Sequence, residues 1–151
     1  ANYCATIANG GTRYKTHFVK SKISSATGVV NETGITVEEE TGVSQKTFDI
    51  VKSGMRRVSL YGGPNRQFNK LKVKTACKTG TSQVVVNGVK HNNGFLITFA
   101  PYDNPEISIG SAIETAGSGS STAEITAAII DYYYSNNDSE EKAQTDSSLL
   151  P

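Results

Sequence analysis

The stretch Ala76–Gln83, "ACKTGTSQ", brings together side chains that can bind an anionic group. Lys78 carries a fixed positive charge, and the hydroxyls of Thr79 and Thr81 can donate hydrogen bonds. Gly80 has no side chain, so another backbone can approach closely at this position. Strict alternation along a strand puts Lys78 and Gly80 on one face and the two threonines on the other. These four residues form the candidate site, although periodicity alone does not direct them into one pocket.

The cysteines and histidines do not have the spacing of a metal site. We therefore expect no metal and no cofactor. For Cys4 and Cys77 we favour two small, buried, free thiols, with a single disulfide as the alternative. By alternation Cys77 points away from Lys78, which favours a place in the core. A thiol beside a lysine can also have a lowered pKa, so a reactive Cys77 is the less favoured alternative.

Length and charge restrict the class of protein. The 151 residues make one domain or a large part of one, able to bury about two thirds of the unfolded surface. Fifteen basic and fourteen acidic residues leave a formal charge of +1, without a dense basic stretch. A nucleic-acid partner is therefore not expected. No apolar run approaches the roughly 20 residues of a membrane helix, and no signal peptide opens the sequence.

Hydrophobic periodicity predicts an α+β domain, with a mainly antiparallel sheet packed against helices. The expected elements are a helix over residues 1–8, a strand over 12–19, a loop or hairpin over 21–42, a helix over 44–61, strands over 71–86, 94–100 and 106–114, and a terminal helix over 121–134. The first helix has no N-cap, so we expect a chain that continues upstream.

Two helices carry the clearest signals. Ser44 is a good N-cap for a helix with an apolar face of Phe48, Val51, Met55 and Val58. A capping box, Ser121–Glu124, is expected to begin the terminal helix. The side chains expected to lie against the sheet are Ile125, Ala128, Ile129, Tyr132 and Tyr133. We place the domain at residues 1–134, followed by a polar, disordered tail over 135–151.

Four stretches, in order, resemble the C-terminal part of a class B penicillin-binding protein transpeptidase domain. They are "ATIANGGTRYK" (5–15), "VSQKTFDIVKSGMRRV" (43–58), "KTGTSQ" (78–83) and "NNGFLITFAPYDNPEISI" (92–109). Lys-Thr-Gly is one of three motifs of the serine penicillin-recognising enzymes. Four stretches in family order are far more specific than this tripeptide alone. The resemblance implies the transpeptidase (β-lactamase-like) fold.

The resemblance also implies roles for the candidate site. The family acts on peptidoglycan stem peptides that end in D-Ala-D-Ala, and β-lactams mimic that end. Lys78 and the hydroxyls of Thr79 and Thr81 would bind the terminal carboxylate, and Gly80 would let the substrate backbone lie close. The N–H of Thr81 corresponds to one donor of the oxyanion hole, so Lys78 and Thr81 carry the expected catalytic contribution.

Two further motifs of the family, S-x-x-K and S-x-N, are not found in family order. The only matches, Ser139–Lys142 and Ser135–Asn137, follow Lys-Thr-Gly instead of preceding it and lie in the polar tail. We reject both as chance matches. The expected protein is thus the C-terminal portion of a D,D-transpeptidase, inactive alone, that pairs with the missing N-terminal part or self-associates.

The resemblance places the parent on the extracytoplasmic face of the bacterial membrane, with its anchor outside this chain. One alternative is a non-catalytic, penicillin-binding-like sensor or scaffold. A fragment of a serine β-lactamase is less favoured, because "ATIANGG" and "FAPYDNPEI" are more similar to the class B transpeptidases. An intact S-x-x-K and S-x-N upstream would distinguish the enzyme from the binder.

Overall fold

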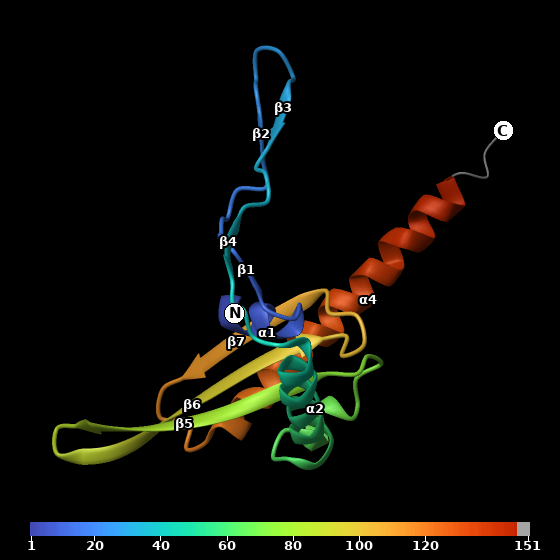
Figure 1. Ribbon diagram of the computed structural model, residues 1–151. Helices are drawn as coiled ribbons and strands as arrows, with labels where there is room; N and C mark the ends of the chain where they lie inside the picture. Colours follow the sequence, from blue (N-terminus) through green and yellow to red (C-terminus); the bar gives the residue numbers. More distant parts are fainter. Residues whose placement is uncertain (148–151) are drawn as a thin grey trace.

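The computed structural model describes residues 1–147, and its centre is a three-stranded antiparallel sheet. The strands are β5 (Ala76–Val86), β6 (Val89–Ala100) and β7 (Ile107–Ile113), and they are neighbours in sequence order (Figure 1). Short connections between consecutive strands favour this arrangement. The expected α+β class and the antiparallel pairing of the three strands are confirmed.

The first two strands differ from the expected ranges because a tight turn was missed. Strand β5 begins at Ala76 instead of residue 71, and β6 begins at Val89 instead of Gly94. Asn87 and Gly88 between them have φ values of 51° and 78°. A two-residue Asn-Gly turn with both residues in the left-handed region matches the twist of the adjoining strands. The two strands therefore form one long hairpin.

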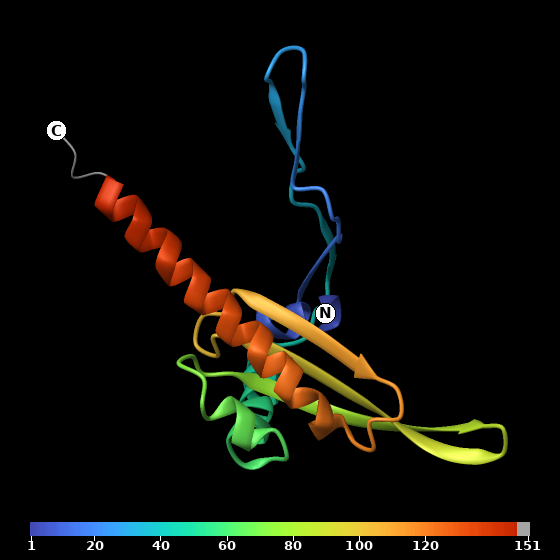
Figure 2. The same cartoon turned by 180° about the vertical axis from the view of Figure 1, so that it is seen from behind.

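Helices cover both faces of the sheet (Figures 1 and 2). On one face lie α1 (Asn2–Ala8) and α2 (Gln45–Tyr61), and on the other lie α3 (Asn65–Phe68) and α4 (Ala123–Ser147). The buried cluster under α1 and α2 contains Cys4, Ile7, Ala8, Phe48, Met55, Ala76 and Phe99. The cluster under α3 and α4 contains Phe68, Cys77, Leu96, Ala123 and Ala127.

Helix α2 begins as the sequence predicts. The Ser44 hydroxyl accepts a hydrogen bond from the backbone N–H of Thr47 at 3.2 Å, which satisfies one of the free donors at the helix start. Of the expected apolar face, Phe48 and Met55 are buried. Val51, however, is 41% exposed, because the buried face also turns toward Ser59.

Helix α4 buries a different face from the expected one. The expected stripe is largely exposed, with Tyr132 at 73% and Ile125 at 55%. The buried positions are instead Ala123, Thr126, Ala127 and Ile130. Small side chains let the helix axis approach the sheet closely, and this packing outweighs the larger stripe. That outcome depends on the sheet and cannot be read from the periodicity of the helix.

Both ends of α4 also depart from expectation. A 3₁₀ turn, η1 (Gly119–Thr122), precedes the helix, so Ser121 lies within this turn and the α-helix begins at Ala123. The helical backbone continues to Ser147, where the polar tail was expected from residue 135. Glutamate, lysine, alanine and glutamine in that stretch are good helix formers. Residues 148–151 of the predicted tail lie outside the described residues. Within residues 1–147 no helix is long and apolar enough to cross a membrane.

A long hairpin, here called the arm (residues 12–40), projects from the body (Figures 1 and 2). Its inner part pairs β1 (Thr12–Tyr14) with β4 (Val37–Glu40), and its outer part pairs β2 (Ser21–Ile23) with β3 (Val30–Glu32). The expected hairpin excursion is confirmed. Its exposed apolar side chains are Phe18, Val19, Ile23, Val29, Val30, Ile35 and Val37.

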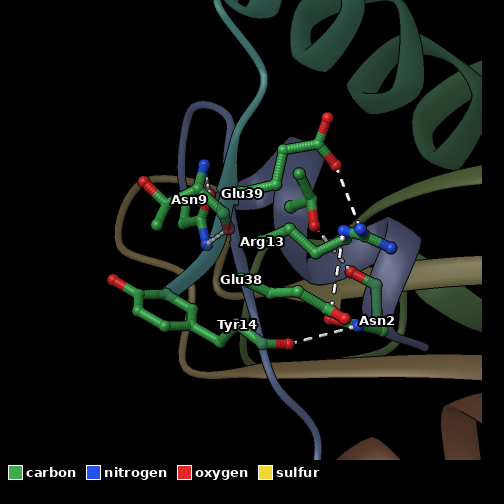
Figure 3. Close-up of polar contacts among 8 residues, drawn as sticks. Asn2, Asn9, Arg13, Tyr14, Glu38 and Glu39 are labelled. Carbon is green, nitrogen blue, oxygen red and sulfur yellow. Dashed lines mark hydrogen bonds and ion pairs between the residues drawn. The ribbon is translucent and has the colours of Figure 1, made fainter. Parts of the chain in front are cut away.

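Polar contacts fix the base of the arm (Figure 3). The Arg13 guanidinium lies 3.1 Å from a carboxylate oxygen of Glu39 and 3.7 Å from one of Glu38. The side-chain amide of Asn2, in α1, donates to the Tyr14 carbonyl at 3.3 Å. These contacts tie the inner strands to each other and to the first helix, whereas the outer strands pair with each other.

Candidate functional site

The four candidate residues lie together on β5, at the edge of the sheet. In the order β5-β6-β7, β5 has β6 as its neighbour on one side only within the described residues. Its open edge therefore presents backbone N–H and C=O groups that an extended peptide could pair with. An open edge is compatible with the close approach of another backbone that we expected at Gly80.

The pairing register assigns the side chains of the site to the two faces of the sheet. Thr79 lies opposite Leu96, which belongs to the buried cluster under α4. Thr81 shares that face, and its hydroxyl accepts a hydrogen bond from the backbone N–H of Gly119 at 3.2 Å. Lys78 alternates to the other face, where its exposed ammonium donates to the Thr79 carbonyl. Strand alternation therefore separates Lys78 from the threonine hydroxyls.

Gly80 has room for a side chain within the described chain. A Cβ built there would meet only the Cβ of Phe95, at 3.4 Å, an ordinary contact distance. Packing within the described chain therefore does not require glycine at this position. The residue remains half-buried on the edge strand, with its backbone accessible for close approach.

Cys77, the residue before Lys78, belongs to the core. Its side chain has no exposed surface and packs with Phe68 and Leu96. Burial raises the pKa of the Cys77 thiol to about 11, although the nearby Ser59 hydroxyl and the charge of Lys78 act in the opposite direction. The thiol is therefore protonated at neutral pH, which contradicts the reactive alternative. Cys4 is also buried and free, so the interpretation of two free thiols is confirmed.

We rejected the S-x-x-K match in the sequence and expected no metal site at the histidines. The side chains of Ser139 and Lys142 lie outside the described part of the chain. His17 is exposed in the arm, where its Nδ1 lies 3.0 Å from the Val19 carbonyl oxygen. In the part of the chain that is described, no three His, Cys, Asp or Glu side chains are grouped so as to hold a metal.

A cavity of about 520 Å³ lies away from β5, at the base of the arm. Its lining is mainly apolar and comes from α1, α2 and the inner arm. The lining residues are Asn2, Tyr3, Thr6, Ile7, Arg13, Glu39, Thr41, Val43, Thr47, Phe48 and Val51. The cavity therefore includes none of the four candidate residues.

Sequence reasoning missed the contact between η1 and β5. A Cβ on Gly119 would come within 2.3 Å of the Gly80 carbonyl oxygen and within 2.5 Å of the Phe95 carbonyl oxygen. The glycines of the short Gly117–Gly119 segment indicate a loop or turn, but nothing in the local sequence indicates which strand this turn contacts.

Comparisons with known proteins identify the family of this chain. Residues 1–131 match the family described as the penicillin binding protein transpeptidase domain. Penicillin-binding protein 2A of Bacillus subtilis is 32% identical over 162 residues, which cover 96% of this chain and 23% of that protein. The peptidoglycan D,D-transpeptidase MrdA of Haemophilus influenzae is 31% identical over 101 residues, covering 57% of this chain and 16% of that protein.

Solved structures show the same fold. Penicillin-binding protein 2B from Streptococcus pneumoniae is similar with a TM-score of 0.75 and 25% identity, over 89% of this chain and 24% of that one. The D,D-transpeptidase domain of a peptidoglycan glycosyltransferase from Eggerthella lenta gives a TM-score of 0.74 at 21% identity, over 89% and 31%. The chain thus spans about a quarter or less of the length of the curated relatives it matches.

Proposed function

Because the chain belongs to the penicillin-binding protein transpeptidase family, we propose that it is the C-terminal portion of a D,D-transpeptidase that cross-links peptidoglycan stem peptides by serine acyl transfer. The observation that carries the proposal is the Lys-Thr-Gly-Thr segment on the open edge of the sheet, at Lys78–Thr81. The roles of these residues are those implied by the family resemblance.

By the family resemblance, Lys78 and the two threonines form a wall that binds the carboxylate at the end of the stem peptide, from the opposite faces of β5 on which alternation places them. The exposed ammonium of Lys78 supplies charge, and the exposed hydroxyl of Thr81 supplies a directional donor. Thr79 adds a second hydroxyl that is partly covered. A β-lactam carries a carboxylate in the corresponding place, so the same wall would bind penicillins.

The backbone of the strand supplies transition-state stabilisation. Attack on the scissile amide puts negative charge on its carbonyl oxygen, and the N–H of Thr81 donates to that oxygen. Loss of one such donor in other acyl-transfer enzymes costs about 3 kcal/mol in the barrier. Gly80 supports this role, because the absence of a side chain lets the substrate backbone lie along β5.

The nucleophile and its base come from another part of the parent protein. Acyl transfer needs a serine hydroxyl, with a lysine one helical turn away to remove its proton. The described chain carries the wall without this pair, so the 151 residues alone should not turn over substrate. We place the parent on the extracytoplasmic face of the membrane, where its substrate lies.

The exposed stripe of α4 supports a partner for the isolated chain. Ile125, Ile129, Tyr132 and Tyr133 are each more than a third exposed. Apolar side chains grouped on one helix face favour burial against another surface. The missing N-terminal part of the domain is the proposed occupant, and self-association of the chain is the outcome when that part is absent.

The test is acylation of the parent protein by a fluorescent penicillin. Lys78→Ala should lower the second-order acylation rate constant at least about tenfold, because a charge-assisted hydrogen bond to the carboxylate is lost. Lys74→Ala is the matched control, since Lys74 precedes β5, is also exposed and pairs with Asp103 at 2.8 Å. It should leave acylation unchanged. An unchanged rate for Lys78→Ala would show that β5 is not the carboxylate wall.

The same assay separates the alternatives. A parent that is acylated but does not cross-link stem peptides would be a β-lactam-binding sensor, and one that quickly hydrolyses the acyl group would be a β-lactamase. The proposed transpeptidase should form a stable penicilloyl adduct and transfer a stem peptide to an amine acceptor.

A further inference from the structure

A ladder of hydrogen bonds connects β5 to β7 through η1 and the start of α4. Its first step is the backbone N–H of Gly119, which donates to the Thr81 hydroxyl at 3.2 Å. The Gly119 carbonyl accepts from the Thr122 hydroxyl at 2.8 Å, and the Thr122 carbonyl accepts from the Thr126 hydroxyl at 2.9 Å. The Thr126 hydroxyl lies 2.8 Å from that of Ser111 in β7.

Burial makes this ladder rigid. Thr122 and Thr126 have no exposed surface, although both carry hydroxyls. A buried hydroxyl without a partner costs roughly 1–3 kcal/mol, so each of these side chains is held to the carbonyl that it contacts. The turn is therefore fixed from within, by groups that water cannot replace.

Close backbone contact fixes the turn against the strands as well. A Cβ on Gly94 in β6 would come within 2.4 Å of the Ser118 carbonyl oxygen. A Cβ on Gly119 would lie 2.8 Å from the Gly80 backbone nitrogen, in addition to its contacts with two carbonyl oxygens. Such distances leave no room for a side chain. The two glycines thus let η1 lie directly on the backbone of the candidate site.

The first step of the ladder also determines where the Thr81 proton can point. A hydroxyl has one donor and two acceptor positions. The Gly119 N–H occupies an acceptor position, so the O–H bond of Thr81 must point elsewhere. Thr81 is exposed on the edge strand, so its O–H bond can point toward solvent. The contact therefore turns Thr81 into a pre-oriented donor.

We propose that Gly119 and Thr122 are positioning residues for Thr81: the η1 turn holds the Thr81 hydroxyl as a hydrogen-bond donor toward the substrate carboxylate. This inference rests on the proposed function, because it needs a carboxylate to reach β5. It goes further because it makes the η1 turn, about 40 residues after the Lys-Thr-Gly motif, responsible for the preference for a substrate with a carboxylate. The turn itself does not touch the substrate.

The test compares the acylation of the parent protein by benzylpenicillin and by its methyl ester, which lacks the anionic carboxylate. Gly119→Ala should lower the rate constant for the acid at least about tenfold. The rate constant for the ester should also fall, but by less, because the added methyl group meets the Gly80 carbonyl oxygen as well. The preference for the acid then falls severalfold. A change that only damages folding would lower both rates together and leave the preference unchanged.

A second variant avoids the steric effect of the added methyl group. Thr122→Val removes the hydroxyl that holds the Gly119 carbonyl and keeps the shape of the side chain, so it should also reduce the preference for the acid. Thr122→Ser retains the hydroxyl and should therefore retain the preference for the acid. Gly54→Ala is the matched control, because a Cβ there has no atom within 4 Å. Thermal unfolding of each variant reports whether it has folded.

Two outcomes separate this inference from the proposed function. If Lys78→Ala abolishes the preference for the acid while Gly119→Ala and Thr122→Val keep it, the carboxylate-binding role of β5 is supported. The positioning role of Gly119 and Thr122 is then wrong. If Lys78→Ala also keeps the preference, the carboxylate wall itself is wrong, and the inference fails with it. Loss of preference in all three variants supports both.

Discussion

The candidate site and the arm are both made of antiparallel strands, but they are supported in opposite ways. Around Gly80, β5 is paired with β6 and contacted by the η1 turn at backbone distance. The arm at residues 12–40 has only its own two-stranded pairing beyond the contacts at its base, and its apolar side chains face solvent. A two-stranded ribbon alone is only marginally stable in water.

This difference indicates where precise chemistry can be located. A catalytic donor must stay within a fraction of an ångström of its productive position, which requires neighbours that are themselves fixed. The site strand has such neighbours in the described chain and the arm does not. The comparison predicts that substitutions near the sheet change stability and chemistry, whereas equivalent substitutions in the outer arm change neither.

The largest expected effect comes from the core beneath the site. Leu96 is 1% exposed and packs with Cys77 and Phe68, so Leu96→Ala should lower the free energy of unfolding by about 2–5 kcal/mol. Ile23, in the outer arm, is 70% exposed, and Ile23→Ala should change the free energy of unfolding by less than about 0.5 kcal/mol. Urea unfolding of both variants checks this contrast. Equal losses would mean that the arm is packed in solution.

A smaller effect should follow alkaline pH. Burial raises the pKa of Cys4 and of Cys77 to about 11, from the ordinary value of 9.0. The unfolded thiols ionise from pH 9 while the folded ones keep their protons, so the unfolded state binds fewer protons in that range. The thiols' contribution to stability is complete below pH 9 and is lost as pH rises toward 11.

Unfolding free energies at a series of pH values from 8 to 11 measure this loss. Each thiol should contribute on the order of 1 kcal/mol per pH unit above pH 9. Cys77→Ala is less stable at every pH because of the cavity it leaves, but its stability should fall less steeply above pH 9. An unchanged slope would show that the Cys77 thiol is accessible to water.

The smallest effect is expected at the base of the arm. Glu39→Gln removes the closer carboxylate partner of Arg13, and both side chains are about half exposed. Surface ion pairs contribute roughly 0.2–1 kcal/mol, so global stability should hardly change. Faster hydrogen exchange should be confined to β1 and β4. Faster exchange throughout the sheet would contradict the separation between arm and body.

Local signals in the sequence predicted much of the sheet and of α2. Alternating apolar residues located β7, and Ser44 located the start of α2, because such features depend on neighbours in the chain. The Asn87-Gly88 turn was visible in the sequence as well. It was missed because Asn92, Asn93 and Gly94, which follow it, weakened the pattern of the second strand.

Features that depend on distant contacts could not be predicted in this way. The stripe through Ile125 and Tyr132 looked like the buried face of α4, yet Thr126 and Ile130 face the sheet. Which face is buried depends on how closely the helix approaches β6. Likewise, the role of Gly119 appears only when the sheet brings it against Gly80, 39 positions earlier in the sequence.

The central claim is that β5 forms the carboxylate wall of a transpeptidase. The most direct test is the acylation rate constant of the parent protein and of its Lys78→Ala variant, measured side by side with benzylpenicillin. We expect at least about a tenfold loss in the variant, with unchanged thermal stability and with full activity in Lys74→Ala. Equal rates for the parent and Lys78→Ala would contradict it.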